Sequence, residues 1–448
     1  MDERRFCNGR ETLMKLRSRS LAKLCSLLAT AALLAGCEQK SDSPSPGKTL
    51  VRYARWGLPE EIRAEEGLLK VFEKENPDIQ VKIEYCSWGE YWNKLQAQMA
   101  AGSAPDVFLL NGGYANDYAA RGQLENLRPW LEKDTSVSLS AFYPQTVDIF
   151  QFDNGLWGMP RDCNTVAMYI NKSLFEKFGV ELPKPDWTWQ DFLEKARKLT
   201  KDENGDGRND IFGFNAGYDS MEVHWGYWVW QNGGQILNIE RTKCLLNEPA
   251  AIEALEFYAG LVTKEKVAPD TAQSSTFGSN IFLTNRVAMS AEGSWMLKAF
   301  SEAQHFKWAI VPLPQGKKKA APVNGLANAM YAKSKNKPAA WRLIKFFASR
   351  PYQELLARSG TSIPAMRAVA ESEVYLDHKV EGKEYFLEQL KYARPLDFTR
   401  GFGKWEDAIR SELELVWLGK KDVAAAARDA AKKVDGILAQ EQKHGTNK

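Results

Sequence analysis

Apolar and polar positions after residue 48 alternate between the period of a strand and the period of a helix. Three predicted strands, at residues 50–56, 79–85 and 106–110, alternate with two predicted helices, at residues 60–76 and 91–101. The first helix places Ile62, Leu69 and Phe72 on one face, and Pro77 follows its end. An alternation of this kind predicts a mainly parallel sheet covered by helices.

The same alternation continues into the middle of the chain, whereas the C-terminal part has mainly helical spacing. Further elements are predicted at residues 165–170, 189–200, 252–263 and 287–291. Long helical patterns follow at residues 339–349, 352–359, 384–392, 404–418 and 423–440. The pattern alone therefore predicts an α/β protein with a helical C-terminal portion.

A basic stretch followed by an apolar stretch precedes this body. Lysine and arginine side chains between residues 15 and 23 come before the apolar run 24–34. That run is shorter than the ~20 residues that span a bilayer, so we expect residues 1–36 to be an export signal. The residues before Met14 are more polar than such a signal requires, which makes Met14 an alternative start.

The end of the apolar run, LAGC at residues 34–37, resembles the bacterial lipobox, in which the cysteine becomes the lipidated first residue of the mature chain. The resemblance implies that Cys37 carries the lipid; an incidental cysteine after an ordinary signal peptide is the alternative. Residues 37–48 are rich in Ser, Pro and charge, as a flexible tether is. We expect the body to lie outside the cytoplasm, attached to the cell membrane by its lipid only.

Bulk composition excludes some classes of function. The formal net charge of +3 lacks the strong basic excess of nucleic-acid-binding proteins. Fifteen tryptophans are many for this length, which suggests that some line a binding surface.

The cysteines beyond Cys37 are Cys86, Cys163 and Cys244. They form no CxxC motif, and buried thiols or a single Cys86–Cys163 or Cys163–Cys244 bridge both remain open.

Short motifs occur in a fixed order along most of the chain. They are AGSAPDV (101–107), GLWGMP (155–160), YINK (169–172), LFEKFG (174–179), DWTWQDF (186–192), QNGG (231–234), VAM (287–289), GSW (293–295), VPLP (311–314), NG (324–325), KSKNK (333–337) and IP (363–364). Together they resemble the bacterial extracellular solute-binding proteins of family 1, which serve ABC importers. Thr188 before the acidic turn at Asp191 is an N-cap, so that motif is structural.

The resemblance implies a two-lobed periplasmic-binding-protein fold (type II), in which mixed sheets are flanked by helices and the ligand lies in the interlobe cleft. The N-terminal lobe is expected at residues 49–160 plus about 314–363, and the C-terminal lobe at about 161–313 plus 364–448. The expected crossings between lobes are at 158–166, 310–314 and 361–365. We expect a monomer that closes around a sugar or oligosaccharide and meets the permease subunits of an importer.

Candidate ligand residues are aromatic rings that stack on a sugar and polar groups that bind its hydroxyls. By resemblance, Trp295 and Trp405 are the expected stacking residues. Trp56, Asn111 and Tyr114 follow strand ends, which face the cleft in open α/β sheets. The remaining candidates lie at a crossing, before QNGG, or beside other motifs: Asp162, Glu222, His224, Trp225, Trp228, Glu292 and Asn324, with Trp88 and Arg400 as weaker ones.

The segment DENGDGRND at residues 202–210 resembles part of a calcium-binding loop. Asp202, Asn204, Asp206 and Asp210 supply oxygens at the first, third, fifth and ninth positions, and a glycine occupies the sixth. The bidentate glutamate expected at position twelve is replaced by Gly213. A structural calcium and a solvated turn are equally compatible with this pattern. No other cofactor is expected.

Two other functions compete with sugar capture. A phosphodiester or polyamine ligand on the same fold is the first, although a phosphate ligand requires clustered basic residues that the candidate list lacks. The second is a lipid-anchored glycoside hydrolase, which needs two carboxyl groups roughly 5–9 Å apart. The sequence contains no GxSxG, HExxH, P-loop or GxGxxG motif. We therefore expect a binding protein rather than an enzyme.

Overall fold

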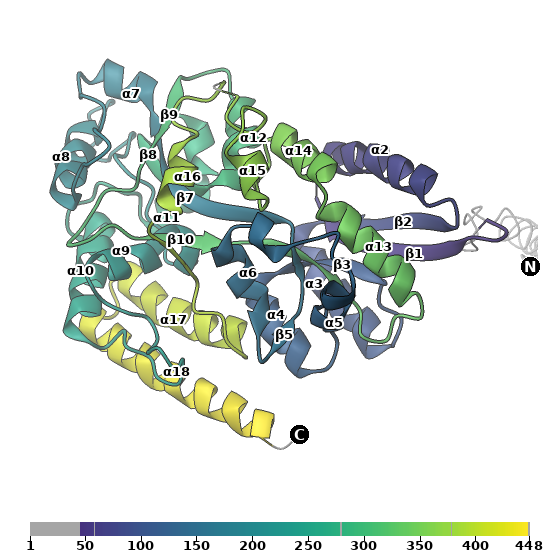
Figure 1. Cartoon of the computed structure of the whole chain (residues 1–448). Coiled ribbons are helices and arrows are strands. Elements are labelled where there is room, and N and C mark those ends of the chain that lie inside the picture. Colours follow the sequence, from purple (N-terminus) through teal and green to yellow (C-terminus); the bar gives the residue numbers. More distant parts are fainter. Residues whose placement is uncertain (1–44, 58, 278–279, 378, 447–448) are drawn as a thin grey trace, which may run out of the picture.

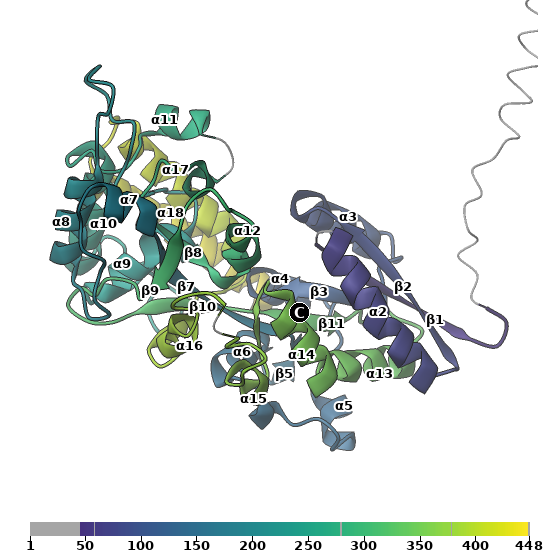
Figure 2. The same ribbon diagram turned by 90° about the horizontal axis from the view of Figure 1, so that it is seen from above.

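The computed structural model describes residues 45–446 except 58, 278–279 and 378. The predicted export signal, the lipidation site Cys37 and most of the tether therefore lie outside the described residues. Two sheets, each flanked by helices, form two lobes that are joined near strands β7, β10 and β11 (Figures 1 and 2). Within the described part of the chain, no helix is both long and apolar enough to cross a membrane.

The first lobe is built on a five-stranded sheet in the order β2-β1-β3-β11-β6. Its strands are β1 (Thr49–Trp56), β2 (Ile79–Cys86), β3 (Val107–Asn111), β6 (Met159–Pro160) and β11 (Leu326–Met330). The first three are parallel, as the sequence pattern predicts, and β11 runs antiparallel to β3 and β6. Helix α2 (Pro59–Glu75) buries Ile62, Leu69 and Phe72 on the predicted face.

Short and medium helices complete this lobe. They are α3 (Trp88–Ala100), α4 (Gly112–Ala120), α5 (Arg128–Lys133), α6 (Pro144–Phe150), α13 (Lys337–Phe347) and α14 (Arg350–Ser359), with the small hairpin β4 (Gln151–Phe152) and β5 (Gly155–Leu156). Pro338 stands at the start of α13, where its fixed φ and missing N–H cost nothing. The helices cover the sheet and leave the ends of its strands facing the other lobe.

The second lobe is organised around β7 (Asp162–Asn171), all ten residues of which are buried. It pairs antiparallel with β8 (Met289–Gly293), β9 (Trp308–Val311), β10 (Ala321–Asn324) and β12 (Ile363–Pro364), while β13 (Ala393–Pro395) lies parallel to β10. The expectation of mainly parallel pairing is therefore wrong for this sheet. Strands that are buried on both faces have no alternating pattern, so the sequence does not reveal their direction.

Helices of the second lobe pack around this sheet. They are α7 (Lys172–Lys177), α8 (Trp189–Leu199), α9 (Gly226–Gln231), α10 (Pro249–Thr263), α11 (Thr271–Thr276), α12 (Leu297–Ser301), α15 (Arg367–Ala370), α16 (Tyr385–Gln389), α17 (Phe402–Trp417) and α18 (Val423–Thr446), with short turns at Met221–Trp225, Ile281–Thr284 and Ser294–Met296. The C-terminal pair α17 and α18 packs together and against α10 (Figure 1). Thr188 caps α8 as predicted.

Within the described residues the chain changes sheet at Arg161, between β6 and β7, and at Gly325, between β10 and β11. It returns to the second sheet at β12 (Ile363–Pro364), inside the crossing expected at 361–365. The second change comes later than the expected crossing at 310–314, which shifts the boundary of the first lobe toward 325. The proline-rich segment expected to cross instead stays in the second lobe, where the Trp187 indole donates to the Pro312 carbonyl at 2.8 Å. Pro312 and Pro314 follow the end of β9, and the chain then forms β10 before it crosses to the first lobe.

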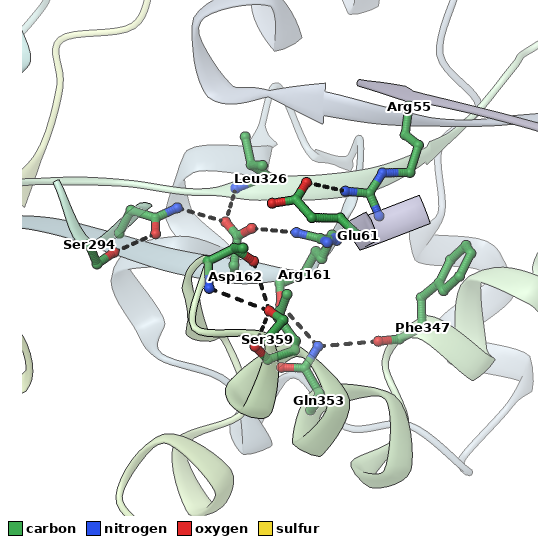
Figure 3. A network of polar contacts seen from close by, with 12 residues as sticks. Arg55, Glu61, Arg161, Asp162, Ser294, Leu326, Phe347, Gln353 and Ser359 are labelled. Carbon is green, nitrogen blue, oxygen red and sulfur yellow. Dashed lines mark hydrogen bonds and ion pairs between the residues drawn. The ribbon is translucent and has the colours of Figure 1, made fainter. Parts of the chain in front are cut away.

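A buried polar network holds the crossings at Arg161 and Gly325 together (Figure 3). The Arg161 guanidinium lies 2.7 Å from the Asp162 carboxylate, which also accepts the Leu326 N–H at 2.9 Å. The Arg161 N–H donates to the Leu326 carbonyl at 2.8 Å. A Cβ on Gly325 would lie 2.8 Å from the Asp162 carbonyl oxygen, so this close approach requires glycine.

Replacing Arg161 by methionine should destabilise the protein by about 3–5 kcal/mol, because it leaves the Asp162 carboxylate buried without its counterion. Urea unfolding at pH 7, followed by circular dichroism, measures this loss. Arg63→Met, at an exposed position on α2, is the matched control and should have little effect. Adding Asp162→Leu to Arg161→Met should restore part of the lost stability. No loss in Arg161→Met would contradict the assigned role of this pair.

Candidate functional site

Aromatic side chains gather where β1 and β3 of the first lobe end. The cluster consists of Trp56, Trp88, Tyr91, Trp92 and Tyr114, which we call the aromatic cluster. The Trp56 and Trp88 rings meet edge to face with centroids 4.8 Å apart, and Tyr114 stacks on Trp92 at 3.7 Å. Trp88 is 47% exposed, so a large apolar ring faces solvent at the edge of the cluster. Such a surface is typical of a binding site.

Local sequence explains how this cluster is assembled. Ser87 and Glu90 form a capping box that starts α3 immediately after β2 and places Trp88 in the first turn. Asn111 ends β3, and its side chain caps α4 by accepting the Gly113 N–H at 2.9 Å. The capping role of Asn111 fixes the direction of α4, which carries Tyr114 toward Trp92.

Three carboxyl groups of the second lobe, Glu222, Glu292 and Glu406, form what we call the acidic cluster. Glu222 lies in the π-helical turn Met221–Trp225, a kind of turn that is frequent at functional sites. Asn324, at the end of β10, donates to Glu222 at 3.2 Å, and the Met221 N–H donates to Glu406 at 3.4 Å. Glu292, near the end of β8, accepts from the Ser290 hydroxyl at 2.9 Å.

Burial changes the proton affinity of the acidic cluster. It raises the pKa of Glu222 to about 7, and the neighbouring charge of Glu406 adds to the effect. The pKa of Glu406 is raised to about 7 by the same cause, with further contributions from Asp407 and Asp219. Burial also raises the pKa of Glu292. Glu222 and Glu406 consequently change their charge close to neutral pH.

His224 lies beside the acidic cluster and is paired with Asp219. Its Nδ1 atom is 2.8 Å from an Asp219 oxygen. The hydrogen bond and charge of His224 lower the pKa of Asp219 to about 2. The histidine therefore already has a carboxylate partner at the edge of the site, while its charge also acts on Glu292.

The aromatic and acidic clusters approach each other where α4 of the first lobe meets the start of α17. Burial raises the pKa of Tyr114, and the charges of Glu406 and Asp407 on α17 raise it further. A Cβ on Gly113 would lie 3.1 Å from the Phe402 ring, and the Gly401 N–H donates to Asp117 at 2.9 Å. The two lobes thus bring rings and hydrogen-bond acceptors to one region.

Comparison with known proteins agrees with this arrangement. Residues 57–354 match the sequence profile of the family described as bacterial extracellular solute-binding protein. The chain belongs to this family. The resemblance inferred from its motifs is confirmed.

The similarity of this solute-binding protein to relatives and solved structures covers most of its chain. A galactooligosaccharide-binding protein of Bacillus subtilis is 24% identical, with 93% of this chain and 98% of that protein covered. A maltooligosaccharide ABC transporter solute-binding lipoprotein of Streptococcus pneumoniae is also 24% identical, with coverages of 94% and 98%. An ABC substrate-binding protein of Listeria monocytogenes, solved with cycloalternan, is 30% identical with a TM-score of 0.80 and covers 88% of this chain and 99% of its own. The two-lobed fold of type II periplasmic sugar-binding proteins is thereby confirmed.

Several predicted ligand residues of this solute-binding protein lie in its core. Trp225, Trp228 and Trp405 are at most 1% exposed. Trp228 packs among aromatic rings that include Trp189 and Phe192. The Trp405 indole donates to the Thr399 hydroxyl at 2.8 Å and its ring meets Phe402 edge to face. These three rings therefore offer no stacking surface, contrary to the prediction.

Asp162 is also placed differently from the prediction. Its side chain is fully buried, and its oxygens accept hydrogen bonds from Arg161, Asn164 and the Leu326 N–H. Because these contacts join the crossings, Asp162 has a structural role. A motif at a crossing does not distinguish a residue that faces the cleft from one that supports it.

Trp295 has the exposed position expected of a stacking residue. It is 38% exposed in the turn Ser294–Met296, and the Ser294 hydroxyl donates to Asn164 at 2.7 Å. A Cβ on Gly293 would lie 2.1 Å from the Trp295 ring, so only glycine permits this ring position. The sequence indicates Trp88 only as a weaker candidate and does not indicate Glu406, because neither residue lies in one of the family motifs.

The loop at 202–210 uses its side-chain oxygens to bind its own backbone. Asp202 accepts from the N–H groups of Gly205 and Gly207, and Asp210 accepts from those of Glu203 and Asn204. Asn204 and Asp206 cap the N–H groups two residues ahead. Across the described residues, no group of three or more His, Cys, Asp or Glu side chains could hold a metal ion. These hydrogen bonds between side chains and backbone hold the loop in a tight turn.

The cysteines of the two lobes are not bridged. Cys86, Cys163 and Cys244 are free thiols, so neither of the two disulfides left open by the sequence is present. Burial raises the pKa of the Cys163 and Cys244 thiols, which keeps them protonated.

The acidic cluster should make stability depend on pH. Glu222 and Glu406 have folded pKa values raised from 4.5 to about 7, so the folded state binds more protons than the unfolded state across that window. The free energy of unfolding of the ligand-free protein should therefore fall as the pH rises from about 5 to 7. In the double variant Glu222→Gln/Glu406→Gln, the free energy of unfolding should depend less on pH. At pH 8 it should exceed that of the wild type by on the order of 1–3 kcal/mol.

Urea unfolding at pH 5, 6, 7 and 8 measures this slope. Glu256→Gln, an exposed carboxyl on α10, is the control and should follow the wild type. An unchanged slope in the double variant would show that these carboxyl groups titrate normally.

Proposed function

We propose that this solute-binding protein captures a sugar or oligosaccharide between its lobes and delivers it to the membrane subunits of an ABC importer. The observation that carries the proposal is the meeting of the first lobe's aromatic cluster with the rings and buried carboxyl groups of the second lobe. Trp56 and Trp88 of the first lobe and Trp295 of the second supply apolar faces, Glu222 and Glu292 supply acceptors, and the Asn324 amide is a donor to Glu222. A carbohydrate has both the flat C–H face and the hydroxyl groups that such a site requires.

The relatives support this class of ligand. Their names specify galactooligosaccharide and maltooligosaccharide, and the Listeria monocytogenes structure contains cycloalternan. Asn111, Tyr114 and His224 lie at the margins of the same region and complete the proposed set of contacts. Trp225, Trp228, Trp405 and Asp162 are left out because the structure buries them.

Closure of the lobes around the sugar is the proposed mechanism. The crossings at Arg161 and Gly325 are short and hydrogen-bonded to each other, so the lobes can rotate about them as rigid bodies. The ligand adds contacts to both lobes and thereby favours the closed form. We propose that importer subunits bind this closed form and that the protein acts as a monomer that requires no cofactor.

A screen of mono- and oligosaccharides by thermal shift tests the proposal, since a ligand that binds only the folded state raises Tm. Ligands found in this way should bind Trp295→Ala at least about tenfold more weakly, a loss of about 1.4 kcal/mol, because the exposed ring no longer stacks on the sugar. Titration calorimetry measures the change. Leu182→Ala, at an exposed apolar position between α7 and α8, should bind normally.

Equal affinity of Trp295→Ala and wild type would contradict the proposed site. A Tm increase with phosphodiesters alone would contradict the proposed ligand class.

A glycoside hydrolase is the second candidate, because Glu222 and Glu406 have the raised pKa that a general acid needs. We favour binding without chemistry because the family consists of binding proteins. Incubation of the protein with its sugar ligand, followed by chromatography, should return the sugar intact. Release of shorter saccharides that depends on Glu222 or Glu406 would favour the enzyme.

We further propose that Cys37 carries a lipid that anchors the protein to the outer face of the cell membrane. Cys37→Ser should move the protein from the membrane fraction to the soluble fraction, because the two lobes contain no helix that could span the membrane within residues 45–446. Fractionation and immunoblotting of expressing cells measure this change. Cys86→Ser is the matched control and should stay in the membrane fraction. Retention of Cys37→Ser would contradict the anchor.

A further inference from the structure

The charges around the acidic cluster are unbalanced. Glu222, Glu292 and Glu406 take part in no ion pair that the described residues provide. The His224 imidazole and the Arg410 guanidinium lie near them, and both already pair with aspartates, His224 with Asp219 and Arg410 with Asp407. The site therefore contains more carboxylates than cations. An anionic ligand would be repelled here.

Buried polar atoms in the same region lack partners. The Oε1 atom of Glu222 is buried and accepts no hydrogen bond from the part of the chain that the structure covers. The Tyr227 hydroxyl is likewise without a partner among the described residues, although its side chain is 0% exposed. Burial raises the pKa of Tyr227, the neighbouring Trp228 indole opposes this shift, and the charge of Glu292 in the acidic cluster adds to it. Buried polar groups of this kind require a partner, and a ligand can supply it.

Closure of the lobes would raise the free-energy cost of the uncompensated negative charge in the acidic cluster. Removing water from adjacent carboxylates strengthens their mutual repulsion, because the interaction between charges grows as the effective dielectric constant falls. A neutral hydroxyl can donate one hydrogen bond to a carboxylate but leaves its charge uncompensated. An ammonium group donates up to three hydrogen bonds and neutralises one charge.

We propose that the acidic cluster binds the ammonium group of an amine-bearing sugar, with Glu222 and Glu406 as its principal partners. The inference rests on the proposed function and narrows the ligand to carbohydrates in which an amine replaces a hydroxyl. Glu292, Asn324 and the Tyr227 hydroxyl complete the surroundings of the amine. The exposed rings of Trp295 and Trp88 and the half-buried ring of Trp56 remain available for the sugar faces.

Neighbouring groups determine how this site responds to pH. Asp219 precedes the turn that carries Glu222, and His224 lies within that turn. Asp407 and Arg410 follow Glu406 on α17. Tyr114 faces these groups from the first lobe. Between pH 5.5 and 7 the principal change is ionisation of Glu222 and Glu406. Affinity for an amine should rise over this range, whereas affinity for a neutral sugar should not.

Calorimetric titration with matched pairs of probes tests the proposal. The pairs are glucosamine and glucose, galactosamine and galactose, the glucosamine disaccharide and cellobiose, and acarbose (which contains a secondary amine) and maltotetraose. We expect at least one amine to bind about tenfold or more tightly than its neutral partner at pH 7. That preference should fall at pH 5.5. Spermidine serves as an amine without a sugar ring.

Variants identify the residues responsible. Glu222→Gln and Glu406→Gln keep the shape but remove the charge, so each should lower the affinity for the amine more than the affinity for its neutral partner and thereby reduce the preference for the amine. Glu256→Gln on α10 should retain the wild-type preference. Equal binding of both members of every pair, or no binding of any amine, would overturn the inference.

The outcomes separate this inference from the proposed function. Neutral sugars that bind at least as tightly as their amines overturn the inference but support sugar capture. Spermidine binding that depends on Glu222 and Glu406, without binding of any sugar, supports ammonium recognition but overturns sugar capture.

Discussion

The buried pair of Arg161 and Asp162 is the interaction on which the two-lobed arrangement depends. Asp162 begins β7, the central strand of the second lobe, and its carboxylate also accepts the Leu326 N–H at the start of β11 in the first lobe. Gly325 permits the contact because a side chain there would collide with the Asp162 backbone. The crossings at Arg161 and Gly325 are therefore fixed to one another.

The two halves of the proposed site belong to different lobes. The first lobe contributes rings at the ends of β1 and β3, and the second contributes the Trp295 ring and carboxyl groups from β8, α17 and the turn before α9. Each half is positioned by local structure, such as the Ser87 capping box or the Asn111 cap. Closure adds desolvation to these prearranged groups, so the contacts of a bound ligand gain strength as water leaves.

Much of the fold follows from the sequence because its signals are local. The periodicity of α2, the cap at Thr188 and the parallel β1-β2-β3 pattern all appear in the structure. The second crossing was expected at 310–314 but lies at Gly325, because a proline motif can end a strand as readily as form a hinge. Trp405 resembles a stacking residue in sequence, yet its ring is buried against Phe402.

The sequence by itself determined the family, the composition of the lobes and the types of side chain available for a ligand, since order of motifs and apolar spacing are properties of the chain. Tertiary structure decided which tryptophans are exposed, which carboxylate supports the hinge and which acids share one region. Burial and charge proximity depend on segments far apart in sequence. Glu222 and Glu406 show this, because folding removes water from both and so raises both pKa values, and it also brings the charge of Glu406 near Glu222.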